Sequence, residues 1–474
     1  MPLHRLREDP GRGQPRRGPA PRANVILLDG CRTVVTMDDA STELADASIL
    51  IESGVINWVG TGRPPGRGQP DVVDGRGLVA IPGLVNTHHH LYQTLTRVRA
   101  QQGGLFDWLR ELYPTWAAID ADWERTAAEV GLAELALSGC STTTDHHYVF
   151  PAGVIGLLEA EIDVAAQLGI RFQPCRGSMD LGQSRGGLPP DSVVEDIDTV
   201  LDATERAIQR FHDPAPGSML RIAVGPCSPF SVSPELMRES AALARKRQVR
   251  LHTHIAETLD EEAYCLKTFN RRPLELLEDF GFLGPDVWLA HCVHLSSADI
   301  HRMAESRTGV AWCPTSNMRL GSGFAPAREM IDAGVSVGIA VDGSASNDSG
   351  NLLAEVRQAL LTTRARKGAA SMTAREALRV ATRGGAACLG RDDIGSIEVG
   401  KRADIALFAV DDLAHRGAEA DPVAALVFCD PGPVRHLFVE GKAVVRDGQV
   451  VNLANARLNP PPPLWGRVGV GGSP

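Results

Sequence analysis

Short apolar runs and longer amphipathic stretches alternate through the middle of the chain. Each apolar run ends in a cluster of polar residues, as buried parallel strands often do. Eight such runs occur, at residues 79–90, 140–147, 170–178, 220–228, 249–257, 287–294, 309–317 and 335–344. Helical spacing marks residues 124–137, 154–168, 192–211, 234–247 and 273–280. Eight alternating β and α units predict a closed (β/α)8 TIM barrel with its active site at the carboxyl ends of the strands.

A second pattern flanks the barrel region on both sides. Residues 24–79 and 390–457 contain short β-like runs between turn signals, and we expect them to pair into one composite β-sandwich domain beside a barrel of residues 80–389. Residues 1–23 are rich in Arg, Pro and Gly, and residues 458–474 begin with a proline run. Both tails are expected to be disordered, and the first lacks the apolar core of a signal peptide.

Composition narrows the class of protein. The 474 residues are 43% hydrophobic and 22% charged, which is ordinary for a globular protein. A net charge of -10 argues against a nucleic-acid partner, and no apolar run is long enough to predict a membrane span. The nine cysteines form no CxxC pair, so we expect buried thiols and a reducing, cytoplasmic compartment. Core thiols are expected at Cys140, Cys175, Cys227, Cys292 and Cys313.

Three consecutive histidines end the first apolar run. In an extended chain His88 and His90 share one face, while His89 points away. The fifth run adds His254 and the eighth adds Asp342. Three imidazoles and one carboxylate form a suitable set of ligands for one divalent metal ion, with zinc favoured and iron an alternative. An open coordination position would accept water.

Two further residues lie near these predicted ligands. Glu257 follows the end of the fifth run, where its side chain could reach a group bound beside the metal, and His291 ends the sixth. A single histidine on a strand is usually structural, and an Asp after an apolar run is often a turn residue. Four predicted ligands at the ends of barrel strands favour the metal site instead. The histidines expected to be structural are His89, His212, His252, His301 and His436.

At this point the chain resembles the amidohydrolase superfamily over about residues 24–455. The resemblance rests on PGLVNTHHH, HTHIAE, AHCVH and VDGSASND, and on GSIEVGKRADIALF at the return to the composite β domain. The fourth run, LRIAVGPCS, lacks the lysine that bridges two metals in binuclear members. The chain is therefore similar to the mononuclear deaminase and chlorohydrolase branch, which implies one metal ion and a homo-oligomer.

The resemblance implies hydrolytic deamination of an aromatic heterocycle. Metal-activated water would lose a proton to Asp342 or His291 and attack the ring carbon that bears the amino group. Glu257 would protonate the adjacent ring nitrogen, and His291 would help to stabilise the new oxyanion. The catalytic residues implied are therefore Glu257, His291 and Asp342.

Four stretches bear on the substrate: HHHLYQTLTR, LFDWLRELYPTWA, TTDHHYVFP and RGSMDLGQSRGGLPPD. They are most similar to 8-oxoguanine deaminases, which implies conversion of 8-oxoguanine to urate and ammonia. Gln93 could read the edge of an oxo-purine, Trp116 could cover its ring, and Arg176 or Arg185 could bond an exocyclic oxygen. Ordinary loop packing remains the alternative for each of these four residues.

Other functions stay open at this stage. The first is a triazine hydrolase of the hydroxydechloroatrazine ethylaminohydrolase type, and the second is a guanine deaminase. A deaminase of the S-adenosylhomocysteine type is less favoured, because nothing in the sequence suggests a site for a ribose and an amino acid. A metal-free scaffold is the non-enzymatic alternative, although such scaffolds have lost ligands that this chain retains.

Overall fold

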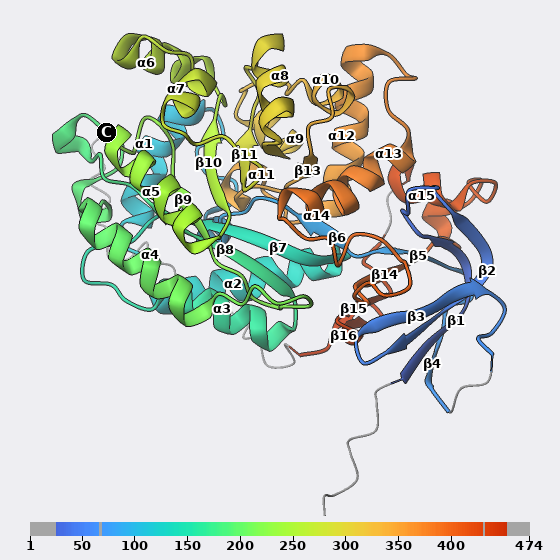
Figure 1. Ribbon diagram of the computed structural model, residues 1–474. Coiled ribbons are helices and arrows are strands. Elements are labelled where there is room, and N and C mark those ends of the chain that lie inside the picture. Colours follow the sequence, from blue (N-terminus) through green and yellow to red (C-terminus); the bar gives the residue numbers. More distant parts are fainter. Residues whose placement is uncertain (1–24, 66–68, 430–431, 453–474) are drawn as a thin grey trace, which may run out of the picture.

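The computed structural model describes residues 25–65, 69–429 and 432–452, and Figure 1 shows its two parts. The two tails expected to be disordered lie outside the described residues. Within the described part of the chain, no helix combines the length and the apolar character needed to cross a membrane.

The first part is a barrel of eight parallel strands that follow one another around the sheet in chain order. They are β6 (Leu84–Asn86), β7 (Cys140–His147), β8 (Arg171–Ser178), β9 (Ala223–Pro226), β10 (Leu251–Ile255), β11 (Val287–His291), β12 (Gly309–Trp312) and β13 (Val337–Ile339). Every residue of these strands is buried, as expected for parallel strands covered by helices. The eight predicted runs each supply one strand, and the prediction of a (β/α)8 barrel is confirmed.

Hydrogen bonds just beyond the first and last strands bring the two edges of this sheet together. Thr87 donates its backbone N–H and its hydroxyl to the carbonyl oxygen of Ile339, at 3.2 and 3.0 Å. The backbone N–H of Val341 donates to Oδ1 of Asn86 at 2.9 Å. These contacts place the residues that follow β6 beside those that follow β13, at the carboxyl end of the barrel.

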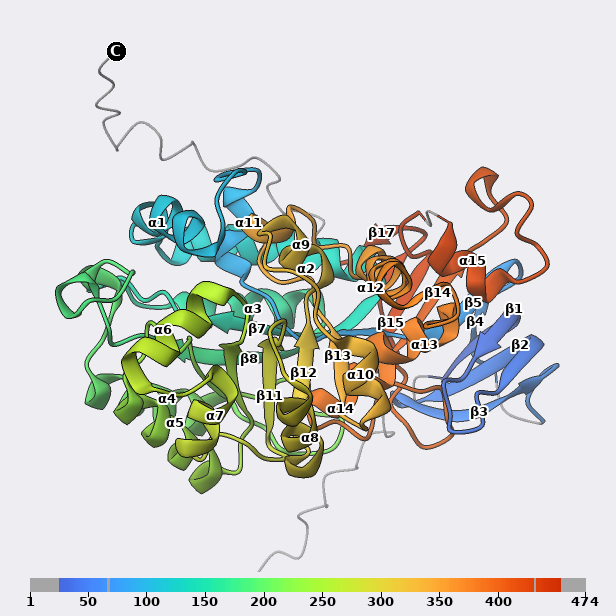
Figure 2. The same cartoon turned by 90° about the horizontal axis from the view of Figure 1, so that it is seen from above.

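Helices cover the outside of the barrel, as seen from a second direction in Figure 2. They include α2 (Ala121–Leu137), α3 (Leu157–Leu168), α4 (Ile197–Phe211), α5 (Pro234–Arg247), α7 (Pro273–Asp279), α8 (Ser297–Ser306) and α12 (Leu352–Lys367). The others are α1 (Leu105–Trp116), α6 (Leu259–Phe269), α9 (Pro314–Arg319), α10 (Ala327–Asp332), α11 (Ser344–Asn347), α13 (Ala374–Arg379), α14 (Gly385–Cys388) and α15 (Pro422–Phe428). A short 3-10 helix, η1 (Leu91–Thr96), follows the three histidines.

Two expected helices begin later than the apolar spacing suggested. The helix predicted over residues 192–211 begins at Ile197, because the side chain of Asp196 caps it by accepting the N–H of Thr199. The helix predicted over residues 154–168 begins at Leu157, directly after Gly156, whose φ of 83° is not helical.

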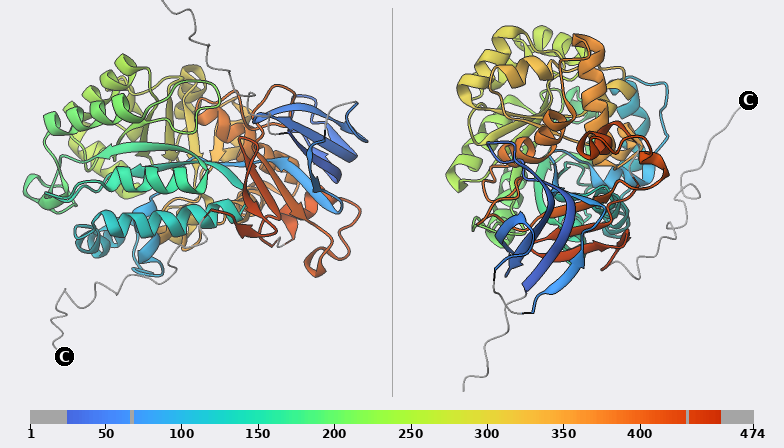
Figure 3. Two further views of the ribbon diagram at one scale, coloured as in Figure 1. Left: turned by 90° about the horizontal axis from the view of Figure 1, so that it is seen from below. Right: turned by 90° about the vertical axis from the view of Figure 1, so that its right-hand side faces the viewer.

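The second part is a nine-stranded mixed sheet built from both flanks of the barrel region. Its strands are β1 (Val25–Val35), β2 (Glu43–Glu52), β3 (Val55–Thr61), β4 (Asp71–Asp74), β5 (Leu78–Pro82), β14 (Ile405–Ala409), β15 (His436–Val439), β16 (Lys442–Arg446) and β17 (Gln449–Val450). The antiparallel pair β5–β14 joins the early strands to the late ones. Figure 3 shows this sheet at one side of the barrel, so the composite β domain is confirmed.

A buried ion pair ties the two parts together. The guanidinium of Arg171, in β8, donates to both carboxylate oxygens of Asp404 at 2.9 and 3.0 Å, and to Glu440 at 2.9 Å. The side chains of Arg171 and Asp404 are each only 1% exposed. If the barrel and the sheet separated, each of these buried charges would lose its partner, at a high cost in free energy. This contact therefore couples the barrel to the sheet.

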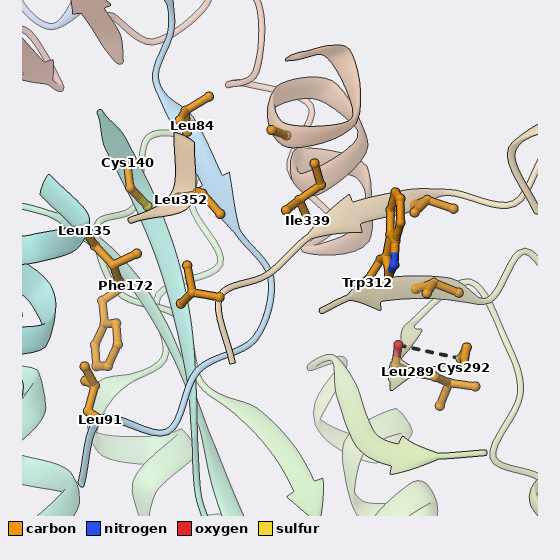
Figure 4. Close-up of a cluster of buried hydrophobic side chains, with 14 of the residues drawn as sticks. Leu84, Leu91, Leu135, Cys140, Phe172, Leu289, Cys292, Trp312, Ile339 and Leu352 are labelled. Carbon is orange, nitrogen blue, oxygen red and sulfur yellow. Dashed lines mark hydrogen bonds between the residues drawn. The ribbon is translucent and has the colours of Figure 1, made fainter. Parts of the chain in front are cut away.

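The apolar core fills the space between the barrel strands and their helices. Figure 4 shows part of it, including Leu84, Phe172, Trp312 and Ile339. All nine cysteines are free, and Cys429 alone among them is partly exposed. The five thiols expected in the core are buried, which agrees with the absence of CxxC pairs.

Candidate metal centre

The four predicted metal ligands meet at the carboxyl end of the barrel. Nε2 of His90 lies 3.1 Å from Nε2 of His254, and Oδ1 of Asp342 lies 3.4 Å from Nε2 of both His88 and His90. The rings of His88 and His90 meet edge to face, with centroids 4.6 Å apart and an interplanar angle of 85°. Strand β6 ends at Asn86, before these histidines, but the alternating directions expected of an extended chain persist beyond it.

Backbone carbonyls orient two of the imidazoles. Nδ1 of His90 donates to the carbonyl of His146 at 2.8 Å, and Nδ1 of His254 donates to the carbonyl of Cys227 at 2.7 Å. A carbonyl oxygen only accepts, so each neutral ring carries its proton on Nδ1. The Nε2 lone pairs of both rings therefore point toward the shared centre.

A second histidine orients the third imidazole. Nδ1 of His252 donates to the carbonyl of Trp288 at 2.7 Å, which leaves Nε2 of His252 as an acceptor. That atom lies 2.8 Å from Nδ1 of His88 and accepts its proton. The Nε2 lone pair of His88 therefore also points at the centre. His252 was expected to be structural, and the structure shows it orienting a predicted ligand.

The charges of the centre match a divalent cation. Burial lowers the pKa of His90 to about 3 and lowers that of His254, which keeps both rings neutral. Burial alone would raise the pKa of Asp342, but His88 and the neighbouring imidazoles hold it well below its usual range. Three converging lone pairs and a carboxylate repel one another unless a cation lies between them. The donor set fits one divalent metal ion.

Hydroxyl groups hold the carboxylate of Asp342 in place. Ser316 and Ser346 donate to its Oδ2 at 2.5 and 3.1 Å, so Oδ1 is left facing the imidazoles. Asp342 has a φ of 63°, a conformation that few non-glycine residues adopt. The turn after β13 therefore has a strained backbone, and this conformation directs the side chain inward.

Glu257 and His291 lie together beside the predicted ligands. Oε2 of Glu257 is 3.6 Å from Nε2 of His291. Burial raises the pKa of Glu257 well above its usual value, with Asp342 and Glu261 adding to the effect, which favours the protonated form of its carboxyl group. Asn317 donates to Nδ1 of His291 at 2.9 Å, which puts the proton of the neutral ring on Nε2. Both groups can therefore offer a proton to a ligand.

The first turn of α6 fixes the backbone under Glu257. The carboxylate of Glu261 accepts the N–H of Ala256 at 3.0 Å and that of Glu257 at 2.8 Å. Ala256 has a φ of 51°, so this bidentate contact stabilises an unusual bend at the end of β10. Glu261 was not among the predicted site residues, because no helix was expected after Glu257.

A cavity of about 410 Å³ opens above the metal centre. Gln93 lines it, and the side-chain oxygen of Gln93 is buried without a hydrogen-bond partner. Its aromatic lining comprises Trp108, Tyr113, Tyr148 and Phe230. The apolar face of α1, with Leu105, Trp108, Leu109 and Tyr113 at helical spacing, was the sequence signal for part of this wall.

The other three predicted substrate contacts lie outside the residues that line this cavity. Trp116 is fully buried behind Trp108, with ring centroids 5.2 Å apart. Arg176 pairs with Glu195 at 2.8 Å and lines a different hollow. Arg185 donates to the carbonyl of Asp180 at 3.0 Å, and its side chain is 58% exposed. Their roles in substrate binding stay predictions, and none of the three contacts the cavity directly.

Comparisons with known proteins agree with this geometry. The sequence profile of the Amidohydrolase family matches residues 79–444. The chain is 46% identical to 8-oxoguanine deaminase of Pseudomonas aeruginosa, covering 87% of this chain and 93% of that one. It is 40% identical to hydroxydechloroatrazine ethylaminohydrolase of a Pseudomonas species, covering 91% and 93%.

A solved structure gives the same picture. The crystal structure of atrazine chlorohydrolase from Arthrobacter aurescens, complexed with zinc, superposes with a TM-score of 0.87 at 37% identity. The match covers 91% of this chain and 99% of that one. The barrel, its converging ligands and these matches along most of the chain place the protein in the amidohydrolase family.

Proposed function

We propose that this protein is a hydrolytic deaminase of an oxo-purine base, converting 8-oxoguanine to urate and ammonia. The observation that carries the proposal is the convergence of three imidazole lone pairs and Asp342 beside the buried Glu257, on the floor of an aromatic cavity. The 46% identity to an 8-oxoguanine deaminase along most of both chains supports this substrate over others.

The reaction would divide its work among a few groups. A divalent ion held by His88, His90, His254 and Asp342 lowers the pKa of water and so supplies a nucleophile at neutral pH. Asp342 accepts the proton that this water loses, because its low pKa keeps it ionised among the imidazoles. This part of the site needs nothing from the substrate except access to the ring carbon that bears the amino group.

Glu257 and His291 supply the protons. Glu257 donates its proton to the ring nitrogen next to the attacked carbon, which its raised pKa allows at neutral pH. The Nε2–H of His291 donates to the new oxyanion. The proton on Asp342 then passes through Glu257 to the amine, the C–N bond breaks and ammonia leaves. The proton of the new hydroxyl returns to Glu257 as the carbonyl forms.

Recognition of the base would rest on Gln93 and the aromatic wall. The unpartnered side-chain oxygen of Gln93 can accept an N–H from the edge of an oxo-purine. Trp108 and Phe230 offer apolar faces to a flat ring.

The finer features of the enzyme belong to the same proposal. Zinc is the proposed metal, because imidazole and carboxylate ligands suit it and a related structure was solved with zinc. A small heterocycle, not a nucleic acid, is the proposed partner, and a homo-oligomer is the expected assembly. Nine free cysteines support a reducing, cytoplasmic location.

Release of the amine from a set of heterocycles tests the substrate, as ammonia from the two purines and as ethylamine from the triazine. The zinc-loaded protein is incubated with 8-oxoguanine, guanine and an N-ethylamino hydroxytriazine, and kcat/KM is compared. We expect 8-oxoguanine to exceed the others at least about tenfold, a difference of about 1.4 kcal/mol in transition-state binding. A larger kcat/KM for the triazine would replace this function with the second candidate, which the 40% identity to the triazine enzyme favours.

Replacement of Glu257 tests the mechanism. In Glu257→Gln the amide keeps the shape but carries no transferable proton, so kcat should fall about 10²–10⁴-fold. Metal content, measured on the same sample, should stay at the wild-type level because Glu257 is not a ligand. A fully loaded variant that works at the wild-type rate would exclude the proposed proton transfer.

Metal content also separates the enzyme from a scaffold. The scaffold alternative requires that the purified chain bind less than about 0.1 equivalent of metal and regain nothing when zinc is added. The converging Nε2 atoms predict tight binding instead.

A further inference from the structure

A second group of buried ionisable side chains lies on the outer side of β7. Along this strand His146 faces the metal centre, where its ring stacks on His254 at 4.8 Å, and its neighbours Asp145 and His147 point the other way. There they meet Glu124 from α2 and Glu161 from α3. All four side chains of this outer cluster (Glu124, Asp145, His147 and Glu161) have no exposed surface.

Three members of the outer cluster converge. One donor atom each from Glu124, His147 and Glu161 lies within 4.8 Å of the other two. Nδ1 of His147 is 3.6 Å from Oε2 of Glu124, which is too far for a hydrogen bond. Two ligand atoms on one tetrahedral zinc ion lie about 3.4 Å apart, so this separation suits an ion between them better than a direct contact.

Most of the donor atoms have no hydrogen-bond partner. Both oxygens of Glu124 are buried and unpaired, and so is Nδ1 of His147. Glu161 shares a side-chain hydrogen bond with Asp145. Nε2 of His147 donates to the carbonyl of Val149 at 2.9 Å, so the neutral ring keeps its proton there and aims an Nδ1 lone pair at the carboxylates. Three unsatisfied acceptor atoms in one buried place are costly unless a ligand binds them.

The carboxylates of the outer cluster have no cationic partner among the described residues, although Arg176 acts on His147 from a distance. Within the described ranges, no Lys or Arg forms an ion pair with Glu124, Asp145 or Glu161, and the electrostatic effects on Glu124 and Glu161 come from other carboxylates. Burial lowers the pKa of His147 to about 3, so its ring is neutral as well. Two carboxylates could therefore be neutralised by a dication or by protons, and the open separation of the donors favours the dication.

We propose that Glu124, His147 and Glu161 bind a second divalent transition-metal ion, separate from the metal of the catalytic centre. An imidazole nitrogen with two carboxylates selects zinc or manganese over calcium and magnesium, which prefer oxygen ligands. The ion would be structural, because the cavity that holds the substrate is lined by none of these three residues.

The second ion would stabilise the strand β7, which supports the catalytic centre on its other face. Asp145, beside His147 on β7, accepts the backbone N–H of Leu91 at 2.6 Å, directly after the ligand His90. On the other face of β7, the carbonyl of His146 accepts the Nδ1 proton of His90. A dication joining β7 to α2 and α3 would fix the strand that positions this ligand.

A metal count on matched variants tests the second site. Each protein is stripped with a chelator, reloaded with Zn²⁺ alone, dialysed, and its zinc per chain measured by mass spectrometry. We expect two ions for the wild type and for Glu129→Gln, a control on the same helix α2. The double variant Glu124→Gln with Glu161→Gln should hold one, and His254→Ala should lose the other.

A second variant and a second measurement keep the test decisive. If the double variant does not fold, His147→Gln removes the nitrogen donor alone and should also hold one zinc ion. Wild-type protein loaded with two ions should melt several degrees above protein loaded with one. One ion per chain in the wild type, with the same count in His147→Gln, would show that protons neutralise the outer cluster and would overturn the proposal.

Discussion

At the residue scale, the side chain of His252 determines the orientation of a predicted metal ligand, His88. It touches no predicted substrate group, yet its hydrogen bond fixes the proton of His88 on Nδ1 and so leaves Nε2 free for the metal. Partners of this kind typically contribute a factor of 10 to 100 to metal affinity. The chain of contacts from Trp288 through His252 to His88 is therefore part of the metal site.

His252→Phe should weaken metal binding. The ring keeps its bulk, but the Nδ1 proton of His88 loses its acceptor, so the zinc Kd should rise about 10–100-fold. Competition with a chromogenic chelator measures this Kd, and circular dichroism checks the fold. His301→Phe, on the surface helix α8, is the control and should leave the Kd unchanged. An unaltered Kd in His252→Phe would mean that His88 is oriented without this contact.

Residue types and their spacing in the sequence are enough to predict the metal ligands, but not the side chains around them. His88, His90, His254 and Asp342 could be predicted because each stands at the end of an apolar run, and barrel strands all end at one face. Glu261 and Trp108 were missed, because their roles depend on how α6 and α1 pack over the strand ends. Trp116 was chosen over Trp108, although one helical face carries both and only the packing of α1 distinguishes them.

At the scale of elements, local chemistry sets the ends of helices and strands. Apolar spacing located the helices and the eight strands, since both patterns repeat over many residues. Where a helix begins depends on single contacts such as the Asp196 cap, which spacing does not report. The histidines lie beyond the end of β6 for a similar reason. Asn86 and Thr87 form hydrogen bonds with residues at and just after the end of β13, which is far away in the sequence.

The connection between α4 and β9 predicts a pH effect on stability. Nδ1 of His212 accepts the backbone N–H of Ile222 at 3.0 Å, which requires a neutral ring. Burial lowers the pKa of His212, helped by Arg221 and opposed by Asp213. The unfolded chain, with a pKa of about 6.5, therefore binds this proton first, so stability falls as the pH drops below about 6.5 and levels off below the folded pKa.

His212→Asn isolates this effect. The side-chain oxygen of Asn can accept the same N–H without titrating, so the variant should lose less stability than the wild type between pH 7 and pH 5. Urea unfolding at several pH values measures the difference. Parallel curves for the two proteins would show that His212 contributes nothing to the pH dependence.

At the scale of the whole molecule, the ion pair of Arg171 joins two parts that differ in architecture. Arg171→Met should lower the free energy of unfolding by about 3–5 kcal/mol, because Asp404 would stay buried without its partner. Arg125→Met is the control, since its 3.5 Å contact with Asp163 is exposed and should contribute less than about 1 kcal/mol. Guanidinium unfolding curves compare them, and equal losses would contradict the argument.

The pairing of β5 with β14 has a consequence for how the chain acquires its fold. Ala80 pairs with Leu407, so nearly the whole barrel is synthesised between two neighbouring strands. Until residue 405 has left the ribosome, β5 has an uncovered edge of the kind that associates with other chains. The chain between β5 and β14 is long, and closing a long loop is slow. The small sheet is therefore completed late, after the barrel has been synthesised. A nascent chain stalled before β14 would thus present an open strand edge to chaperones, although most of its catalytic residues had already emerged.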